Sequence, residues 1–143
     1  MLPGYHRGVR AVVEKMGETA PELLKKIMVI DFNLEVLKEL AGRNVKGVFG
    51  DISSMDTLDH AHVAKAEIIF STIPDMLLKK TGNLSLVKTC RTIAPNAVIV
   101  ATVDSMDRIE ELKKKGANEI FLPYAFISES LAWIIFGIYG KNN

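Results

Sequence analysis

Carboxylates that directly follow buried strands are the side chains of this sequence best placed to do chemistry. In "KKIMVIDFNLEV", the four apolar residues 27–30 predict a strand buried on both faces, and Asp31 comes directly after them. Helical spacing begins at once in "FNLEVLKEL". A carboxylate at such a strand end can accept hydrogen bonds from both hydroxyls of a ribose. The alternative is a solvated acid that stabilises the N-terminus of the next helix.

Two more acidic positions follow later strands in the same way. Asp51 ends "VKGVFGD", and the pair Pro74 and Asp75 closes "EIIFSTI". In a parallel sheet the carboxyl ends of the strands meet at one edge, and ligands bind beyond that edge. The pattern therefore predicts that Asp31, Asp51 and the Pro74–Asp75 pair share one edge of a sheet.

A glycine-containing turn is expected before the first helix, in "GYHRGV". Its backbone amides at a helix N-terminus favour an anion, and Arg7 adds positive charge. The spacing G-x-G-x-x-G is not met, because His6 and Val9 stand where the second and third glycines belong. Only residues 1–3 precede Gly4, so the first strand of such a fold is truncated or missing. Either the chain begins inside the domain, or another segment or chain fills that place.

The remaining elements alternate between β-rich and helical patterns. Strands are predicted at 27–31, 45–51, 67–73, 97–103 and 119–124, and helices at 9–16, 19–26, 34–41, 53–61, 84–94, 105–116 and 128–140. Continuous Val/Ile strands between amphipathic helices predict an α/β fold with a Rossmann-like, doubly wound parallel sheet. The 143 residues suit one domain.

Composition excludes several classes of function. The net charge of +1, with both signs scattered, gives no basic surface for nucleic acid. No apolar run reaches the eighteen or so residues of a membrane helix. His60 and His62 lack the further ligands that zinc needs, and a solvated helix end is expected. Cys90 is expected in the core, since no base accompanies it.

Five motifs in order, "GYHRG", "VIDFN", "GD" at 50–51, "STIPD" and "KGANEIFLP", resemble the nucleotide-binding lobe of RCK domains, also called TrkA-N domains. The most similar branch is the cytoplasmic regulatory domain of Kef-type monovalent cation:proton antiporters. The resemblance runs from Gly4 to about Leu131. It implies a Rossmann-like lobe at 1–124, followed by a C-terminal crossover and dimerisation helix at 125–143.

The resemblance also implies a ligand, NAD(H) or an adenine nucleotide such as AMP, ADP or ATP. It assigns the binding residues by matching position. The phosphates would be met by Gly4, His6, Arg7 and Gly8. Asp31 would take the ribose hydroxyls, with Phe32 and Asn33 beside it, while Asp51 and Ile52 would flank the adenine. The near side would be closed by Thr72, Ile73 and Pro74, and Asn83 matches an asparagine of the following helix.

The final helix, "SESLAWIIFGIYG", has apolar side chains on nearly every face, which marks a partner surface. We expect a homodimer through Trp133, Ile134 and Phe136. The implied partner is a membrane transporter domain, on the same or another chain, regulated from the cytoplasmic side of the membrane.

Two alternatives to a nucleotide sensor stay open. One is a small NAD-dependent oxidoreductase, although no Tyr-x-x-x-Lys or His–Asp pair is placed to move a proton. The other is a structural domain that has lost its ligand, which the altered glycine turn favours.

Overall fold

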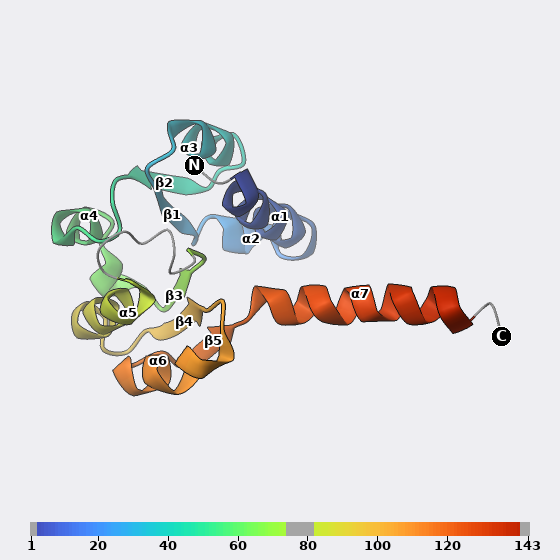
Figure 1. The fold of residues 1–143 in the computed structure, drawn as a ribbon. Coiled ribbons are helices and arrows are strands. Elements are labelled where there is room, and N and C mark those ends of the chain that lie inside the picture. The colour runs from blue at the N-terminus through green and yellow to red at the C-terminus, as the bar shows by residue number, and fades with distance from the viewer. Residues whose placement is uncertain (1–2, 74–81, 141–143) are drawn as a thin grey trace. The chain divides into compact units, whose positions relative to one another are not determined.

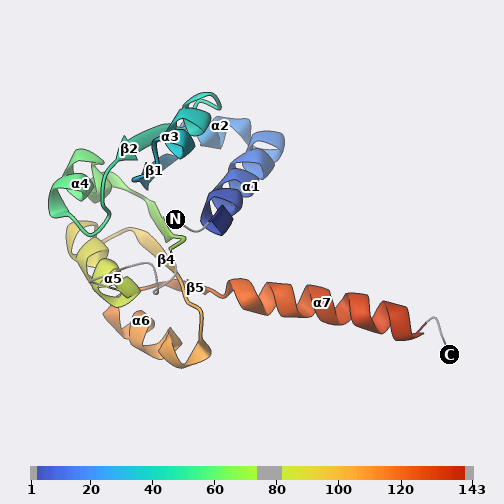
Figure 2. The ribbon, with the colours of Figure 1, turned by 45° about the horizontal axis from the view of Figure 1, so that its top comes forward.

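The computed structural model describes residues 3–73 and 82–140, with side chains from Arg10 onward in these ranges. The contacts divide the chain into two compact units (Figures 1 and 2). Unit 1 comprises Met1–Glu67 and Thr92–Ala97, and unit 2 comprises Ile68–Arg91 and Val98–Asn143. All strand pairs of the described residues are parallel, so the predicted α/β class with parallel strands is confirmed.

Unit 1 is built around a two-stranded parallel sheet of β1 and β2. In chain order its elements are α1 (Pro3–Thr19), α2 (Pro21–Leu24), β1 (Met28–Asp31), α3 (Leu34–Ala41), β2 (Lys46–Phe49), α4 (Met55–His60) and the 3₁₀ helix η1 (Val63–Lys65). Helices α1 and α3 meet the sheet through a small apolar core of Val13, Val36, Leu40 and Val45. This core fixes the side of β1 and β2 that faces away from solvent.

Local signals determine where α3 begins and ends, as the sequence predicts. Asn33 is the N-cap, and its Oδ1 accepts the backbone N–H of Glu35 at 3.0 Å. Such a bond satisfies one of the free amides of the first turn. Gly42 ends the helix, and its N–H bonds to the carbonyls of Lys38 and Leu40. The predicted helix at 34–41 is therefore confirmed at both ends.

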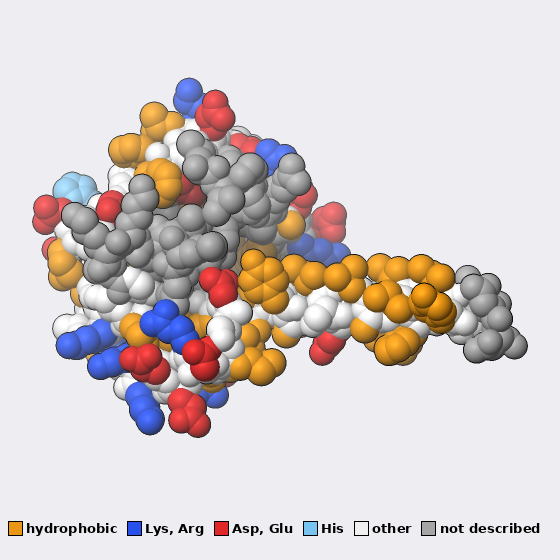
Figure 3. Space-filling model, in the orientation of Figure 1, with side chains coloured by type: hydrophobic (Ala, Val, Ile, Leu, Met, Phe, Trp, Pro, Cys, Tyr) orange, Lys and Arg blue, Asp and Glu red, His pale blue; other side chains and the backbone are white. Residues whose placement is uncertain are grey.

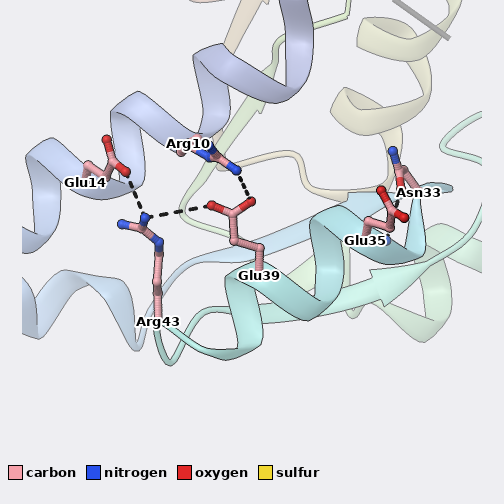
Figure 4. Close-up of polar contacts among 6 residues, drawn as sticks. All are labelled: Arg10, Glu14, Asn33, Glu35, Glu39 and Arg43. Atoms are coloured by element: carbon pink, nitrogen blue, oxygen red, sulfur yellow. Dashed lines mark hydrogen bonds and ion pairs between the residues drawn. The ribbon is translucent and has the colours of Figure 1, made fainter. Parts of the chain in front are cut away.

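Four charged side chains tie α1 to α3 on the surface of unit 1 (Figure 4). Arg10 Nη2 donates to Glu39 Oε2, and Arg43 Nη2 donates to Glu14 Oε1 at 2.8 Å. Arg43 also lies 3.8 Å from Glu39 Oε1. Glu39 therefore forms ion pairs with both arginines, and the pairs bridge segments that are distant in sequence. Because these side chains are partly solvated, the pairs orient the helices more than they stabilise them.

Unit 2 contains a three-stranded parallel sheet in the order β3-β4-β5. Its elements are β3 (Ile68–Ser71), α5 (Gly82–Ile93), β4 (Val98–Thr102), the 3₁₀ helix η3 (Met106–Arg108), α6 (Ile109–Lys115), β5 (Glu119–Phe121) and α7 (Pro123–Gly140). The core comprises Val87 and Cys90 of α5, Ile99, Ala101 and Val103 of β4 and its continuation, Leu112 of α6, and Ala117. Cys90 is thus a core residue, as predicted.

The parallel strands form two sheets, whereas one doubly wound sheet would have been continuous. In the usual strand order 3-2-1-4-5-6, the first strand is hydrogen-bonded to both the second and the fourth. Among the described residues no strand precedes α1, so β1 and β3 are edge strands of separate sheets.

The predicted boundary between the first two helices is wrong. We expected helices at 9–16 and 19–26, but α1 continues through Gly17 and stops at Thr19. The N-cap of α2 is Ala20, and the Thr19 hydroxyl donates to the carbonyl of Lys15. In the predicted helix at 105–116, the first residues form η3, and Met106 is 71% exposed, while Leu112 of α6 lies in the core.

Helix α7 has no buried residue along its 18 positions. Apolar side chains cover much of its surface in Figure 3. The exposed ones include Phe126, Trp133, Ile134, Phe136 and Tyr139, and Trp133 is 78% exposed. Phe126 alone among these rings has a described aromatic neighbour, Phe121 of β5, with ring centroids 5.7 Å apart. Within residues 3–73 and 82–140, no helix combines the length and apolar character that crossing a membrane requires.

Candidate functional site

The tips of β1 and β2 bring two aspartates to the same edge of unit 1. Asp31 is the last residue of β1 and pairs in register with Phe49, the last residue of β2. The ladder continues one step beyond, because Gly50 N–H donates to the Asp31 carbonyl at 3.2 Å. Asp51 follows Gly50 directly. The prediction of a shared edge is therefore confirmed for Asp31 and Asp51. It is wrong for the third strand, because β3 lies in a separate sheet, and Pro74 and Asp75 after it lie outside the described residues.

Each of these aspartates is held by the same kind of turn. Asp31 Oδ1 accepts the backbone N–H of Asn33 at 2.8 Å, and Asp51 Oδ1 accepts that of Ser53 at 2.8 Å. The hydroxyl of Ser53 adds a third bond of 2.8 Å to Asp51 Oδ1. In such a turn, an aspartate side chain accepts the backbone N–H two residues further on, and this bond fixes the orientation of the carboxylate. Both carboxylates are thus fixed at their strand tips by residues two positions further on.

The second oxygen of each carboxylate is available to a ligand. Within the described residues, Oδ2 of Asp31 and Oδ2 of Asp51 have no hydrogen-bond partner. The backbone N–H of Ser53, and then its hydroxyl, lower the pKa of Asp51 below its ordinary value. Asp51 is consequently a stable anion at neutral pH. Two acceptor oxygens on adjacent strand tips suit a ligand that carries hydroxyl or amino donors.

The neighbours of these carboxylates include one residue that the sequence analysis missed. Phe32 is exposed, while Ile52 and Asn33 are partly buried, and Asn33 is the cap of α3. Phe49 is 60% exposed and lies beside Asp31 in the ladder. Register partners on parallel strands point to the same face, so this ring and the Asp31 carboxylate share one side of the sheet. The sequence did contain a signal for this residue, because a phenylalanine stands directly before Gly50-Asp51 at the end of the predicted strand.

The glycine segment does not form the turn that we expected. Helix α1 begins at Pro3, so Gly4, His6, Arg7 and Gly8 lie in its first turns. The predicted loop conformation is wrong, because these residues continue the helix that runs to Thr19. The first amides of any helix lack intrahelical acceptors, and the helix dipole still favours an anion there. The assignment of these residues to phosphates stays a prediction.

The residues predicted to close the site belong to unit 2. Thr72 and Ile73 follow β3 and are partly buried, and Pro74 lies outside the described residues. Asn83, in the first turn of α5, is 0% exposed. Its Oδ1 accepts from the Ser71 hydroxyl at 2.8 Å, and its Nδ2 donates to the Ile73 carbonyl at 2.8 Å. The Asn83 side chain is therefore buried within unit 2, and its assignment to the ligand stays a prediction.

Other candidate chemistry is weak in this structure. In the described part of the chain, no three His, Cys, Asp or Glu side chains gather into a group able to hold a metal ion. His60 is exposed, and its Nδ1 lies 3.2 Å from the Asp56 carbonyl at the end of α4. Burial raises the pKa of the Cys90 thiol, which opposes the thiolate form that nucleophilic chemistry requires.

Comparison with known proteins agrees with this geometry. The profile of the TrkA-N domain matches residues 1–123. The chain is 32% identical over 128 residues to "Probable potassium channel protein 2" of Methanocaldococcus jannaschii, covering 87% of this chain and 35% of that protein. It is 29% identical over 109 residues to the glutathione-regulated potassium-efflux system protein KefC of Cronobacter sakazakii, covering 73% of this chain and 17% of that protein. The chain thus spans about a third or less of these relatives.

Solved structures share the fold. The TrkA-N domain of the inner membrane protein ybaL from Escherichia coli superposes with a TM-score of 0.68 at 22% identity, covering 85% of this chain and 87% of that one. The GsuK channel bound to NAD superposes with a TM-score of 0.63 at 24% identity, covering 80% of this chain and 19% of that one. With its parallel strands, its acidic strand tips and the profile match over residues 1–123, this chain belongs to the TrkA-N domain family.

Proposed function

We propose that this chain is a nucleotide-sensing regulatory domain of a potassium or other monovalent cation transport protein. Its ligand is NAD(H) or an adenine nucleotide such as AMP, ADP or ATP. The observation that carries the proposal is the pair of strand tips in unit 1, where Asp31 and Asp51 each hold one oxygen in a turn and keep the other available. The potassium-transport relatives and the NAD in the GsuK channel structure support the choice of ligand and role.

In this proposal each residue has a distinct task. Asp31 Oδ2 accepts from the ribose hydroxyls, because a carboxylate at this strand tip suits two vicinal donors. Asp51 and Ile52 flank the adenine, and the exposed ring of Phe49 offers a flat apolar surface beside them. Phe32 and Asn33 border the ribose. The phosphates lie toward Gly4, His6, Arg7 and Gly8 at the start of α1.

Calorimetry with NAD⁺, NADH, AMP, ADP and ATP tests the proposal, using wild type and Asp31→Asn. The substitution keeps the Oδ1 acceptor for Asn33 but removes the charge, so the turn is retained. A hydrogen bond to a charged group contributes about 1.5–3 kcal/mol, so the Kd of Asp31→Asn is expected to rise roughly tenfold or more. The matched control is Glu22→Gln, which removes one exposed charge in α2, a helix that precedes the N-terminal end of β1 and not its tip.

The outcomes of this titration separate the alternatives. Equal affinity of wild type and Asp31→Asn would show that the ribose assignment is wrong. Turnover of an alcohol or aldehyde with the bound nicotinamide would favour an oxidoreductase. No binding by the chain, nor by a version extended to include a first strand, would favour a ligand-free structural domain.

We also propose that the chain pairs as a homodimer through α7, with the domain boundary near 124/125 separating lobe and dimerisation helix. An 18-residue helix with no buried side chain is poorly placed in a monomer, because its apolar surface stays in water. Ligand binding would favour one arrangement of the dimer and bias an attached transporter on the same or another chain, from the cytoplasmic side.

The dimer is tested by sedimentation of wild type, Trp133→Asp and the matched control Ser130→Asp. Both variants add one charge to α7, but only Trp133→Asp removes a large exposed apolar side chain. We expect Trp133→Asp to be monomeric, while wild type and the control sediment as dimers at the same concentration. A monomeric wild type would remove this proposal.

A further inference from the structure

The end of β2 and helix α4, both in unit 1, come into close contact at Gly50. Gly50 directly follows β2, and its N–H donates to the Asp31 carbonyl at 3.2 Å, so it continues the ladder with β1. A β-carbon added to Gly50 would lie 2.7 Å from Cγ2 and 2.7 Å from Oγ1 of Thr57 in α4. Real β-carbons essentially never come within 3.0 Å of another heavy atom. The contact between strand end and helix therefore leaves no room for a side chain at position 50.

Space, and not backbone conformation, is what requires a glycine here. Among the described glycines only Gly82 and Gly116 have a positive φ, so Gly50 is not held in the left-handed region. Thr57 does not give way easily, because its side chain branches at Cβ and its χ1 is restricted. The next residue, Leu58, is 3% exposed and anchors α4 in unit 1. A methyl group at position 50 would therefore push α4 away from the strand end.

The segment between Gly50 and α4 carries the Asp51 carboxylate. Asp51 follows Gly50, and its Oδ1 accepts the backbone N–H of Ser53 at 2.8 Å. Its carbonyl accepts the N–H of Ser54 at 3.0 Å, and Ser54 is the N-cap of α4. The Asp51 turn is thus joined to the strand on one side and to the helix on the other. Any displacement of α4 has to be taken up within this turn.

We propose that Gly50 is a positioning residue of the nucleotide site: because it has no side chain, α4 packs against the end of β2 and holds the Asp51 turn beside the tip of β1. This inference rests on the proposed function, in which Asp51 flanks the adenine. Gly50 itself does not need to touch the ligand. Its contribution is a preformed Asp51 turn, which spares the ligand the cost of ordering that turn on binding.

The test compares Gly50→Ala with the matched variant Gly47→Ala in the full chain. Gly47 lies in β2 and pairs in register with Val29. A β-carbon added there would also lie 2.7 Å from a side-chain atom, Leu37 Cδ2, but the next atoms of Leu37 are 3.5 Å away. Because Cδ2 is the far end of a flexible side chain, it can rotate aside. Both variants therefore add the same methyl group near an equally close neighbour, and only Gly50→Ala displaces α4.

Two further variants show whether the contact with Thr57 is the cause. Thr57→Ala removes both atoms that lie 2.7 Å from the added β-carbon, so the double variant Gly50→Ala/Thr57→Ala should restore the packing. If Gly50→Ala does not fold, Gly50→Ala/Thr57→Ser takes its place, because serine keeps only one of the two close atoms. The Kd for NADH and for ADP is measured by calorimetry. The ¹H–¹⁵N shifts of the Ser53 and Ser54 amides, which both donate to Asp51, are measured without ligand.

We expect the Kd of Gly50→Ala to rise about tenfold, as for the loss of one hydrogen bond to a charged group, and that of Gly47→Ala to change less than about twofold. The double variant should bind within about twofold of Thr57→Ala. The Ser53 and Ser54 amide shifts should move in Gly50→Ala and return in the double variant.

The other outcomes separate the steps of this inference. Unmoved amide shifts in Gly50→Ala, or an equal rise of the Kd in Gly47→Ala, would overturn the positioning role. Moved shifts with an unchanged Kd would overturn its link to the ligand. If wild type binds neither nucleotide, the proposed function fails, and the amide shifts alone decide whether Gly50 positions the Asp51 turn.

Discussion

Replacing Gly116 by alanine should destabilise unit 2 strongly, because this position combines an unusual backbone with a close neighbour. Gly116 ends α6 with φ 116° and ψ 10°, in the left-handed region. A β-carbon added there would lie 2.9 Å from Arg91 Cγ and 3.1 Å from Arg91 Cβ. Real β-carbons essentially never come within 3.0 Å of another heavy atom, so Arg91 would have to shift, and the backbone conformation would be strained as well.

The expected magnitude follows from two contributions. A left-handed conformation costs a residue with a β-carbon about 1–2 kcal/mol. Arg91 Nη2 donates to the Gly116 carbonyl at 2.7 Å and also to Asn118 Oδ1, and displacing this guanidinium loses about 1 kcal/mol for each bond. Gly116→Ala should therefore lower the free energy of unfolding by about 2–4 kcal/mol. That is a large part of the usual total of about 5–15 kcal/mol.

Urea unfolding followed by circular dichroism measures this loss, with Gly17→Ala as the control. Gly17 lies within α1, and an added β-carbon would meet only Leu24 Cδ1, at an ordinary 3.5 Å. Alanine is favoured over glycine inside a helix by about 0.5–1 kcal/mol, so this variant should be slightly more stable than wild type. The same substitution thus has opposite signs at the two sites. A Gly116→Ala midpoint within error of wild type would refute the reasoning from backbone conformation and contact.

Two further predictions concern the charges of unit 1. Glu39→Gln weakens the contacts of α3 with both Arg10 and Arg43. Because these ion pairs are partly solvated, we expect the free energy of unfolding to fall by about 1 kcal/mol or less, and this loss to shrink in high salt. Urea unfolding at two salt concentrations measures the loss. Since the folded-state pKa of Asp51 lies below its ordinary value of 3.8, the stability that it adds is present above that pH and is lost as the pH falls through the lowered pKa. Asp51→Asn should therefore have a flatter acid limb in urea midpoints measured from about pH 6 to about pH 3, and an acid limb identical to wild type would contradict the bonds to Ser53.

Features that depend on neighbouring residues were predicted well from the sequence. The helix at 34–41, its cap Asn33 and its end at Gly42 all follow from signals within two or three positions. Asp31 at the end of β1 follows from the apolar run before it. The shared edge of Asp31 and Asp51 needed only the further step that consecutive βαβ strands are parallel. These predictions succeed because the hydrogen bonds that decide them are local.

The glycine segment shows where local reasoning fails. Gly4 and Gly8 are typical of a turn, yet α1 runs through both. Glycine is permissive and not a turn signal by itself, so it takes the conformation that its surroundings favour. The same holds for Gly17, which does not end α1. Only the arrangement of the following elements decides between a turn and a helix at such positions.

The sequence alone determined the α/β class, the order of most strands and helices, and the acidic strand tips, since periodicity and capping act over a few residues. The tertiary structure decided the division into two sheets and the burial of Asn83. That side chain is satisfied by Ser71 and Thr102, which lie 12 and 19 positions away. The sequence pattern shows that an asparagine is present in the first turn of α5. It does not show that two strand ends converge on it, because burial is a property of the packed chain and not of any one segment.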